Sequence, residues 1–525
     1  MIGSNNNPLR QFSQGVVPSW DLYACAFLTM MLFFQVCQWT LFPRFLDIYY
    51  HLGVVRGFAE AGGYTPWALW ECAPVGRPQL YPPFLHWLLL GPFTAGVPFI
   101  EIARAVDCLS FPALLASGWM LARRLTGACS AFVWLILFSS LYSVYLAAST
   151  LPAFNLAFIL SFLSLTAAVD SKSRLAAVLA GLVIYTHLLA AVFLIAVYAI
   201  WTLSAGAGKR AGLIRILSAA LIIGAPMLLY AGCWSGWFAR PALRENNFFD
   251  VDPWLFAASI AGIYFAKKTS REPGLVFALF LSGFVGAFFY PVRCLTGQGL
   301  FGVAMLATIA IEALAKNTAS RFGRPAAAVG SAAVMLMFVF VLPVLEVNLQ
   351  TRTAVPRWFD RTLSRFCVNA DRLSFKVRGF TVYFPQDYAR LAELIEANSK
   401  RSDILWSGFA HGAGILSMLT GRPTSSAMLA EVLPGAAFDP VAAAKISVWF
   451  KDRQGSPTAF MKKMTDLYRL KLAGQTDLAF VYVNHAPAVI PQRSKHLVVS
   501  WWIVIGYFIV LSIAACRFVG LPRIS

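Results

Sequence analysis

Charged residues are scarce in this chain. They make up 13% of its 525 residues, whereas hydrophobic residues make up 58% and the mean hydropathy is +0.66. Soluble globular proteins carry roughly 25% charged residues, about twice this share. Acidic residues are scarcest outside residues 347–497, because 11 of the 24 lie within that segment and only 13 are spread over the other 374 positions. This composition excludes a soluble multidomain enzyme and predicts a membrane protein.

Cysteine motifs and nucleic-acid signatures are also missing. The nine cysteines form no Cys-x-x-Cys motif and show no metal-ligand spacing, so we interpret them as small apolar residues. The net charge is +19, but Lys and Arg outside residues 347–497 lie mostly in short clusters between apolar runs. That pattern is typical of loops that set membrane topology and not of a nucleic-acid-binding face. No nucleic-acid partner is expected.

Long apolar runs dominate what is present. A helix needs about 20 residues to cross a membrane core of about 30 Å. The first run, 22–42, is too long for a signal-peptide core and is interpreted as a membrane anchor. Further runs lie near residues 101–122, 128–147, 154–169, 174–205, 212–232, 253–266, 273–290, 298–315, 326–346 and 498–516.

Two apolar stretches are ambiguous, and the charges between runs decide them. The stretch 174–205 is too long for one helix, and 84–100 is interrupted by Gly91-Pro92 and Pro98. If 174–205 is a hairpin that turns near His187, and 84–100 does not cross, five basic clusters reach one side of the membrane. These clusters are Arg123/Arg124, Lys172/Arg174, Lys209/Arg210/Arg215, Lys267/Lys268/Arg271 and Lys316/Arg321/Arg324. The sequence thus predicts an all-α polytopic membrane protein with about twelve transmembrane helices and both termini inside.

This topology places two large segments outside the cytoplasm. The first outer loop covers residues 44–100, and residues 347–497 form an extracytoplasmic soluble domain of ordinary size. Helical periodicity at Asp387–Ser399 and short apolar strands at Asp403–Trp406 and Leu478–Val483 predict a mixed α/β domain. The chain then divides into a transmembrane module (1–346), this domain, and a final helix with a tail (498–525). Any chemistry is expected at the outer face.

An acid and a histidine follow the first apolar run directly. Asp47 and His51 are four residues apart, so they share one face of a helix. A carboxylate at a membrane boundary is only partly hydrated, which suits it to act as a base. The alternative is structural, with Asp47 as a helix-cap acid and His51 as its hydrogen-bonded neighbour.

The same loop contains the turn Gly76-Arg-Pro-Gln-Leu-Tyr-Pro-Pro83. Pro83 suits the first turn of a helix, where its missing N–H costs nothing. Arg77 lies just before that turn and can hold a phosphate by charge-assisted hydrogen bonds, although an interfacial arginine can equally anchor to lipid headgroups. His86, one turn into the helix, is interpreted as interfacial packing.

These features together resemble the GT-C superfamily of polytopic glycosyltransferases, which use polyprenyl-phosphate-linked sugars. Members of this superfamily include the protein O-mannosyltransferases, the aminoarabinose transferases and the catalytic subunits of oligosaccharyltransferases. It covers roughly residues 20–345, and its specific part is the 47–83 segment with its acid and its Gly-x-Pro-x-x-Tyr-Pro-Pro turn. The resemblance implies a fold with an outer active site and a lipid-linked donor.

The resemblance also implies roles for individual residues. Asp47 matches the catalytic acid of the first loop, and His51 is assigned a supporting catalytic role. Arg77 matches a basic position that holds the donor phosphate. Other candidates for contact with that phosphate are His187, Arg293, Arg240 and Arg244, and the substrate loop comprises Tyr81, Pro82 and Pro83.

Two departures from the family pattern limit the expectation. The segment 148–155, where a second acid is expected, contains no carboxylate, so a hard divalent metal would have few oxygen ligands. A metal-independent, cofactor-free reaction is therefore favoured. A Trp-Trp-Asp motif is absent, because Trp501-Trp502 is followed by Ile503, which argues against asparagine-linked oligosaccharide transfer.

The predicted function is transfer of a sugar from a polyprenyl-phosphate donor to an extracytoplasmic lipid, glycan or protein acceptor. A polyprenyl phosphate is a good leaving group, so positioning and charge neutralisation suffice, and a single displacement predicts inversion at the anomeric carbon. The enzyme would be a multi-pass protein of the cytoplasmic membrane, in contact with its lipids. Two alternatives remain. One is a transporter or flippase of polyprenyl-linked sugars, whose sequence would be expected to contain two repeated halves and charged residues near the middle of the membrane. The other is a non-catalytic scaffold for envelope assembly.

Overall fold

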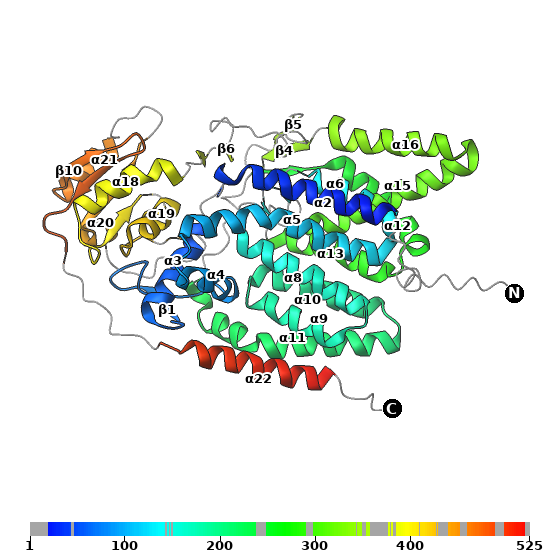
Figure 1. The fold of residues 1–525 in the computed structure, drawn as a ribbon, viewed down its shortest axis with the longest axis horizontal. Helices are drawn as coiled ribbons and strands as arrows, with labels where there is room; N and C mark the ends of the chain where they lie inside the picture. Colours follow the sequence, from blue (N-terminus) through cyan, green and yellow to red (C-terminus); the bar gives the residue numbers. More distant parts are fainter. Residues whose placement is uncertain are drawn as a thin grey trace.

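The structure is a computed structural model. It describes residues 19–41, 43, 47–141, 144–145, 147–148, 151–237, 248–289, 298–342, 344–348, 353–357, 376–377, 380–381, 385–408, 410–426, 428, 439–451, 459–488 and 498–519. Figure 1 shows a bundle of long helices, which includes the last helix of the chain, with the helices and strands between residues 385 and 488 at one end of it.

The bundle consists of apolar helices whose sequences carry few charges. Their bounds are α2 (Ser19–Cys37), α5 (Phe99–Thr126), α6 (Ala128–Ser139), α8 (Pro152–Val169), α9 (Ser173–Ile184), α10 (Leu188–Ser204), α11 (Ala207–Cys233), α12 (Pro253–Thr269), α13 (Pro273–Phe289), α15 (Phe301–Phe322), α16 (Arg324–Leu336) and α22 (Trp501–Val519). Short 3₁₀ turns flank them at η1 (Trp39–Leu41), η2 (Ser235–Trp237) and η3 (Gln298–Leu300).

Every apolar segment predicted to cross the membrane overlaps at least one of these helices. The predicted hairpin over 174–205 is confirmed, because α9 and α10 are separated by a turn at residues 185–187. By length and composition, five helices of the described chain suffice to cross a membrane: α2, α8, α11, α15 and α22. Shorter apolar helices such as α6 and α9 accompany them.

The predicted run 326–346 is wrong at its C-terminal end. After α16 the chain continues as a π-helical turn, η4 (Met337–Val341), and then forms strand β4 (Val344–Asn348). The sequence has Pro343 at this point, and a proline lacks the N–H that continues a helix. Consequently the boundary predicted between residues 346 and 347 falls inside a strand.

The first outer loop contains two helices, α3 (Asp47–Ala61) and α4 (Phe84–Thr94). Between them β1 (Trp67–Ala68) pairs with β2 (Arg77–Pro78) in an antiparallel ribbon. Gly76 precedes β2 with a φ of +73°, and a Cβ there would lie 2.6 Å from the Ala68 carbonyl oxygen, so the turn requires glycine. At 11 residues, α4 is about 16 Å long and too short to cross.

A second group of elements, between residues 385 and 488, packs at the α3 end of the bundle (Figure 1). Its sheet has the order β10-β11-β9-β8, with β8 and β9 parallel and the other pairs antiparallel. The elements are α18 (Pro385–Ala397), β8 (Leu405–Ser407), α19 (Ala410–Thr420), α20 (Pro440–Ala443), β9 (Ile446–Phe450), α21 (Ala459–Leu467), β10 (Lys471–Gln475) and β11 (Ala479–Val483). The helix and the strands predicted in this segment are thereby confirmed.

Two further small sheets join distant parts of the chain. Strand β3 (Phe248–Val251), which lies between α11 and α12, pairs with β4, and β4 pairs with β5 (Thr353–Arg357). Strands β6 (Lys376–Val377) and β7 (Phe380–Thr381) form a two-residue ribbon.

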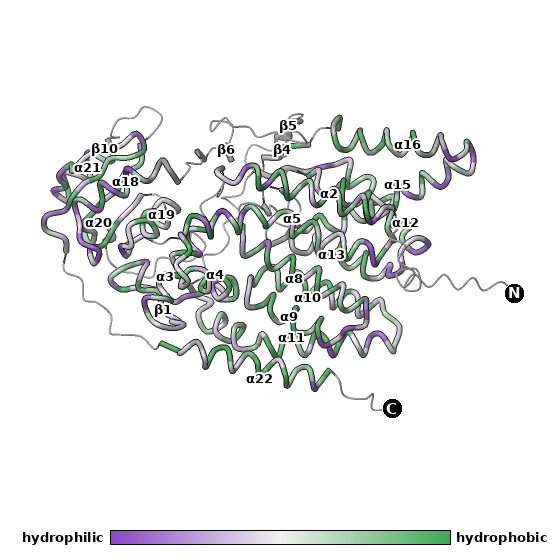
Figure 2. Tube along the Cα trace, in the orientation of Figure 1, coloured by the Kyte–Doolittle hydropathy of each residue, from purple (hydrophilic) through white to green (hydrophobic). Residues whose placement is uncertain are grey.

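The basic clusters lie at the end of the bundle opposite to α3, and we call this end the basic end. Ion pairs connect different helices and loops there: Arg123 with Asp21, Arg124 with Asp170, and Lys209 with Glu272. Lys316 pairs with Glu312 one turn away on α15. Arg271 also donates its backbone N–H to the Leu125 carbonyl. Figure 2 shows the hydrophilic residues of the bundle gathered at this end, whereas the helices between the two ends are hydrophobic.

Candidate active site

Helix α3 carries the two residues predicted to be catalytic on one face. Asp47 is the first residue of the helix and half-buried, and His51 lies one turn further on, with 2% of its surface exposed. The free backbone N–H groups and the macrodipole at a helix N-terminus favour an ionised carboxylate. Asp47 is therefore placed to accept a hydrogen bond or a proton.

His51 is paired with a second buried histidine. Its Nδ1 lies 3.0 Å from Nε2 of His86, which comes from α4. Burial lowers the pKa of His51 to about 3, and burial together with His51 lowers the pKa of His86. Both imidazoles are therefore neutral, and one donates to the other. His86, which was interpreted as interfacial packing, is fully buried, packs against the rings of His51 and Tyr81, and holds His51 in place.

Tyr81 and His187 extend the His51–His86 pair into a cluster of four ring side chains. The Tyr81 ring contacts His51 edge-on, with centroids 4.8 Å apart, and contacts His187 with centroids 5.8 Å apart. His187 in turn contacts Phe154 at the start of α8. A backbone hydrogen bond from Phe84 N–H to the Tyr185 carbonyl, 2.8 Å, fixes α4 against the α9–α10 turn. The structure thus brings Tyr81, His51 and His187 together from three separate segments.

Arg77, on strand β2 of the same loop, takes part in a buried ion pair. Its Nη2 is 2.6 Å from Oε2 of Glu71, and both side chains are 1% exposed. Burial opposes the charged guanidinium, but the Glu71 carboxylate outweighs it and raises the pKa of Arg77. The same Glu71 oxygen accepts the backbone N–H of Met428 at 3.1 Å. Arg77 therefore holds a carboxylate already, and a donor phosphate would have to compete with Glu71.

Two buried polar residues that the sequence does not single out, Glu71 and Gln79, belong to the same loop segment as Arg77. Glu71 and Gln79 are each 1% exposed. The second carboxylate oxygen of Glu71, the side-chain amide of Gln79 and Nδ1 of His86 are buried without a hydrogen-bond partner within the described protein. Buried polar atoms usually have a partner, so these atoms are suited to bind a ligand or water. Their spacing in the sequence follows no motif that would have revealed them.

Two charged residues near the start of α5 lie close to α3. Arg104 forms an ion pair with Glu101, at 2.6 Å. Asp107 is buried near Tyr49 of α3: burial, and then the Asp107 carboxylate, raise the pKa of Tyr49.

The remaining predicted residues fall into two groups. Pro82 and Pro83 are buried, and Pro83 is the residue that precedes α4. Arg240, Arg244 and Arg293 lie outside the described residues. Within the described parts of the chain, no three His, Cys, Asp or Glu side chains form a group that could hold a metal ion, and independence from metal stays a prediction.

Comparison with known proteins identifies the fold. Neither a protein-family model nor a curated protein sequence matches the chain. Among solved structures, ArnT from Cupriavidus metallidurans in the apo state superposes with a TM-score of 0.54 and 13% identity, covering 90% of this chain and 100% of ArnT. The chain has the fold of the GT-C glycosyltransferases.

Two further structures have the same architecture. The archaeal oligosaccharyltransferase AglB from Archaeoglobus fulgidus, solved with an inhibitory peptide and a dolichol-phosphate, has a TM-score of 0.52 and 10% identity, covering 82% of this chain and 69% of AglB. The arabinofuranosyltransferase AftD from Mycobacteria has a TM-score of 0.51 and 15% identity over 89% of this chain. The match spans 40% of AftD's length.

Proposed function

We propose that this protein is a membrane glycosyltransferase that moves a sugar from a polyprenyl-phosphate-linked donor to an extracytoplasmic acceptor. The observation that carries the proposal is the position of Asp47. It is a half-buried carboxylate at the N-terminus of α3, one turn from the His51–His86 pair, at the α3 end of a GT-C fold. The dolichol-phosphate present in the AglB structure supports a lipid-phosphate donor.

In the proposed reaction, Asp47 takes the proton from an acceptor hydroxyl as that oxygen attacks the anomeric carbon. The bond between the anomeric carbon and the phosphate oxygen breaks, and polyprenyl phosphate leaves with the electron pair. A single displacement inverts the anomeric configuration. His51 supports the site as a neutral hydrogen-bonding group, because its low pKa denies it a positive charge at neutral pH.

Charge on the departing phosphate has to be neutralised for this step to be fast. We assign that role to Arg77, Arg293, Arg240 and Arg244, with His187 donating a hydrogen bond and Tyr81, Pro82 and Pro83 forming the substrate loop. Neither a metal nor a cofactor takes part. The protein would lie in the cytoplasmic membrane, with this site facing the extracytoplasmic side.

The test compares the unmodified protein with Asp47→Asn in lipid, using radiolabelled polyprenyl-phosphate sugars and an envelope extract as acceptor. Loss of a general base should reduce transfer about 10²-fold or more. Asp477→Asn, an exposed carboxylate in the β10–β11 turn, is the matched control and should leave transfer unchanged.

Other outcomes would separate the alternatives. Equal transfer by Asp47→Asn would remove Asp47 as the base. Movement of an intact donor across the vesicle would indicate a flippase. A folded protein that neither consumes nor moves any donor would favour a scaffold.

A further inference from the structure

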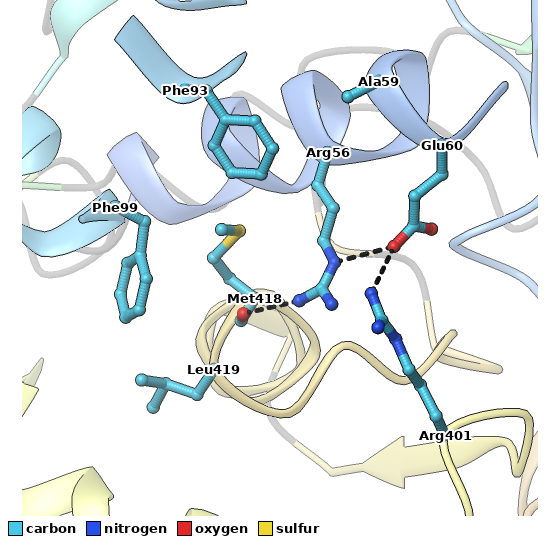
Figure 3. A pocket seen from close by; sticks show the side chains of 8 residues that line it. All are labelled: Arg56, Ala59, Glu60, Phe93, Phe99, Arg401, Met418 and Leu419. Carbon is cyan, nitrogen blue, oxygen red and sulfur yellow. Dashed lines mark hydrogen bonds and ion pairs between the residues drawn. The ribbon is translucent and has the colours of Figure 1, made fainter. Parts of the chain in front are cut away.

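A cavity of about 440 Å³ lies on the face of α3 that points away from Asp47. At 100° per residue, Arg56 is about 180° around the helix from Asp47, so this cavity is separate from the candidate active site. Its walls come from α3, from the last turn of α4, from the first turn of α5 and from α19 (Figure 3). Helix α19 belongs to the group of elements between residues 385 and 488, which we call the C-terminal segment.

Two arginines share one carboxylate at the polar side of this cavity. Nε of Arg56 and Nη2 of Arg401 each donate to the same oxygen of Glu60, both at 3.0 Å, and Nη1 of Arg56 donates to the Met418 carbonyl at 3.0 Å. Figure 3 shows the two guanidinium groups converging on Glu60 from opposite elements. Two positive charges face one negative charge, so the group retains a net charge of about +1 at neutral pH.

The opposite side of the cavity is apolar. Phe93 at the end of α4, Phe99 at the start of α5, and Met418 and Leu419 from α19 form it. Helix α4 carries no charged residue, is too short to cross a membrane and exposes Leu88 by 50%, and an exposed apolar surface of this kind suits contact with lipid. The cavity therefore combines a cationic rim with apolar walls beside a short apolar helix.

We propose that this cavity binds the phosphate head of an anionic membrane glycerophospholipid, whose first acyl carbons pack on Phe93 and Leu419. The phosphate would share Arg56 and Arg401 with Glu60, or displace Glu60 from them, because a phosphate offers more acceptor oxygens and more charge than a carboxylate. Such a lipid would link α3 and α4 of the first outer loop to the C-terminal segment, because Arg56 and Arg401 belong to those two parts.

The experiment measures binding of dihexanoyl phosphatidic acid to the full-length protein in a neutral detergent, by native mass spectrometry. Arg401→Gln should weaken binding roughly fivefold, the size of one exposed charge contact, whereas Glu60→Gln should strengthen it because the competing anion is gone. Arg401 and Glu60 are exposed by 69% and 53%, so both variants are expected to fold. Lys462→Gln, an exposed cation on α21, is the matched control and should change nothing.

Further ligands define the chemistry that is recognised. Dihexanoyl phosphatidylcholine, which has no net charge, and inorganic phosphate, which has no tail, should both bind more weakly than the phosphatidic acid. Equal binding of inorganic phosphate, or an unchanged affinity in Glu60→Gln and Arg401→Gln, would overturn the proposal. Binding of farnesyl phosphate alone, with the same response to the two variants, would overturn the assignment to a glycerophospholipid.

Discussion

Glu71 is the residue on which the candidate site and the C-terminal segment both depend. Its carboxylate holds Arg77 at 2.6 Å and accepts the N–H of Met428. A buried ion pair contributes little net stability, but removing one partner leaves an uncompensated charge in a poorly hydrated place. The pair therefore predicts a non-additive pattern of mutational effects.

Arg77→Met should destabilise the protein by about 3 to 5 kcal/mol, because Glu71 would be left charged and unpaired by Arg77. The double variant Arg77→Met/Glu71→Gln should recover most of that loss, since glutamine can still accept from Met428. Thermal unfolding in detergent measures both effects. Additive losses would contradict the buried-pair interpretation, and a double variant that is stable but inactive would indicate that Arg77 acts on the donor.

The neutral His51–His86 pair predicts how stability depends on pH. Histidine in an unfolded chain has a pKa near 6.5, whereas His51 in the folded protein has a pKa of about 3. Between these values the unfolded chain binds a proton that folded His51 does not. This contribution to stability is complete above about pH 6.5 and is lost as the pH falls towards 3, at up to about 1.4 kcal/mol per pH unit.

The measurement is the unfolding midpoint at pH 7.5 and at pH 5.0 for the unmodified protein and for His51→Asn. The variant should lose less stability between the two pH values, whatever its absolute midpoint. His485→Asn, an exposed histidine after β11, should retain the pH dependence of the unmodified protein. Parallel pH profiles for the unmodified protein and His51→Asn would show that another group causes the loss.

At the scale of elements, α12 and α15 approach each other at a glycine. A Cβ on Gly262 would lie 1.9 Å from the backbone carbonyl oxygen of Leu306, so no larger residue fits without separating the helices. Small residues permit this kind of close contact between membrane helices, where packing replaces the hydrophobic effect as the driving force.

Gly262→Ala should therefore lower the unfolding temperature and the yield of folded protein. Gly232→Ala is the control, because nothing lies within 4 Å of the position of its Cβ on α11 and alanine is a better helix former by about 0.5 to 1 kcal/mol. Thermal unfolding of both variants checks the pair. A neutral Gly262→Ala would show that α12 and α15 pack less closely than described.

Elements defined by local sequence were the predictable part. The apolar runs, the turn near His187 and the helix at Asp387–Ser399 follow from composition and periodicity within a few turns of chain. Pairings between distant segments were not predictable: β3 with β4, His51 with His86, and Glu71 with Met428 depend on contacts across 35 to 357 residues. A single sequence contains no signal that connects such partners, so Asp47 and His51 could be selected from their local spacing, whereas the partners His86 of His51 and Glu71 of Arg77 could not.

For the whole molecule, the ion pairs of the basic end test the predicted topology most directly. Five basic clusters were expected on one side of the membrane, and residues from four of them, Arg123 and Arg124, Lys209, Arg271 and Lys316, lie at one end of the bundle, where Arg123, Arg124, Lys209 and Arg271 make contacts between different helices and loops. The first outer loop and the C-terminal segment lie at the other end (Figure 1).

Single cysteines at Lys172 and at Lys400, in a background without native cysteines, should be labelled from opposite sides of the membrane. A membrane-impermeant maleimide applied to intact cells should modify Lys400→Cys directly and Lys172→Cys only after the cells are opened. Both side chains are exposed, so access to them reports topology and not burial. Labelling of both from the same side would contradict the arrangement.

The contacts of the first outer loop also decide when the protein can become active during its own synthesis. Asp47 and His51 leave the ribosome early, whereas Met428, the partner of Glu71, is translated 357 residues after Glu71, and Val499, which pairs with Tyr64, follows later still. At 5 to 20 residues per second, the wait for Met428 is roughly 20 to 70 seconds. During that interval the nascent chain would hold an incomplete site, so that newly inserted molecules would remain inactive until translation has almost finished.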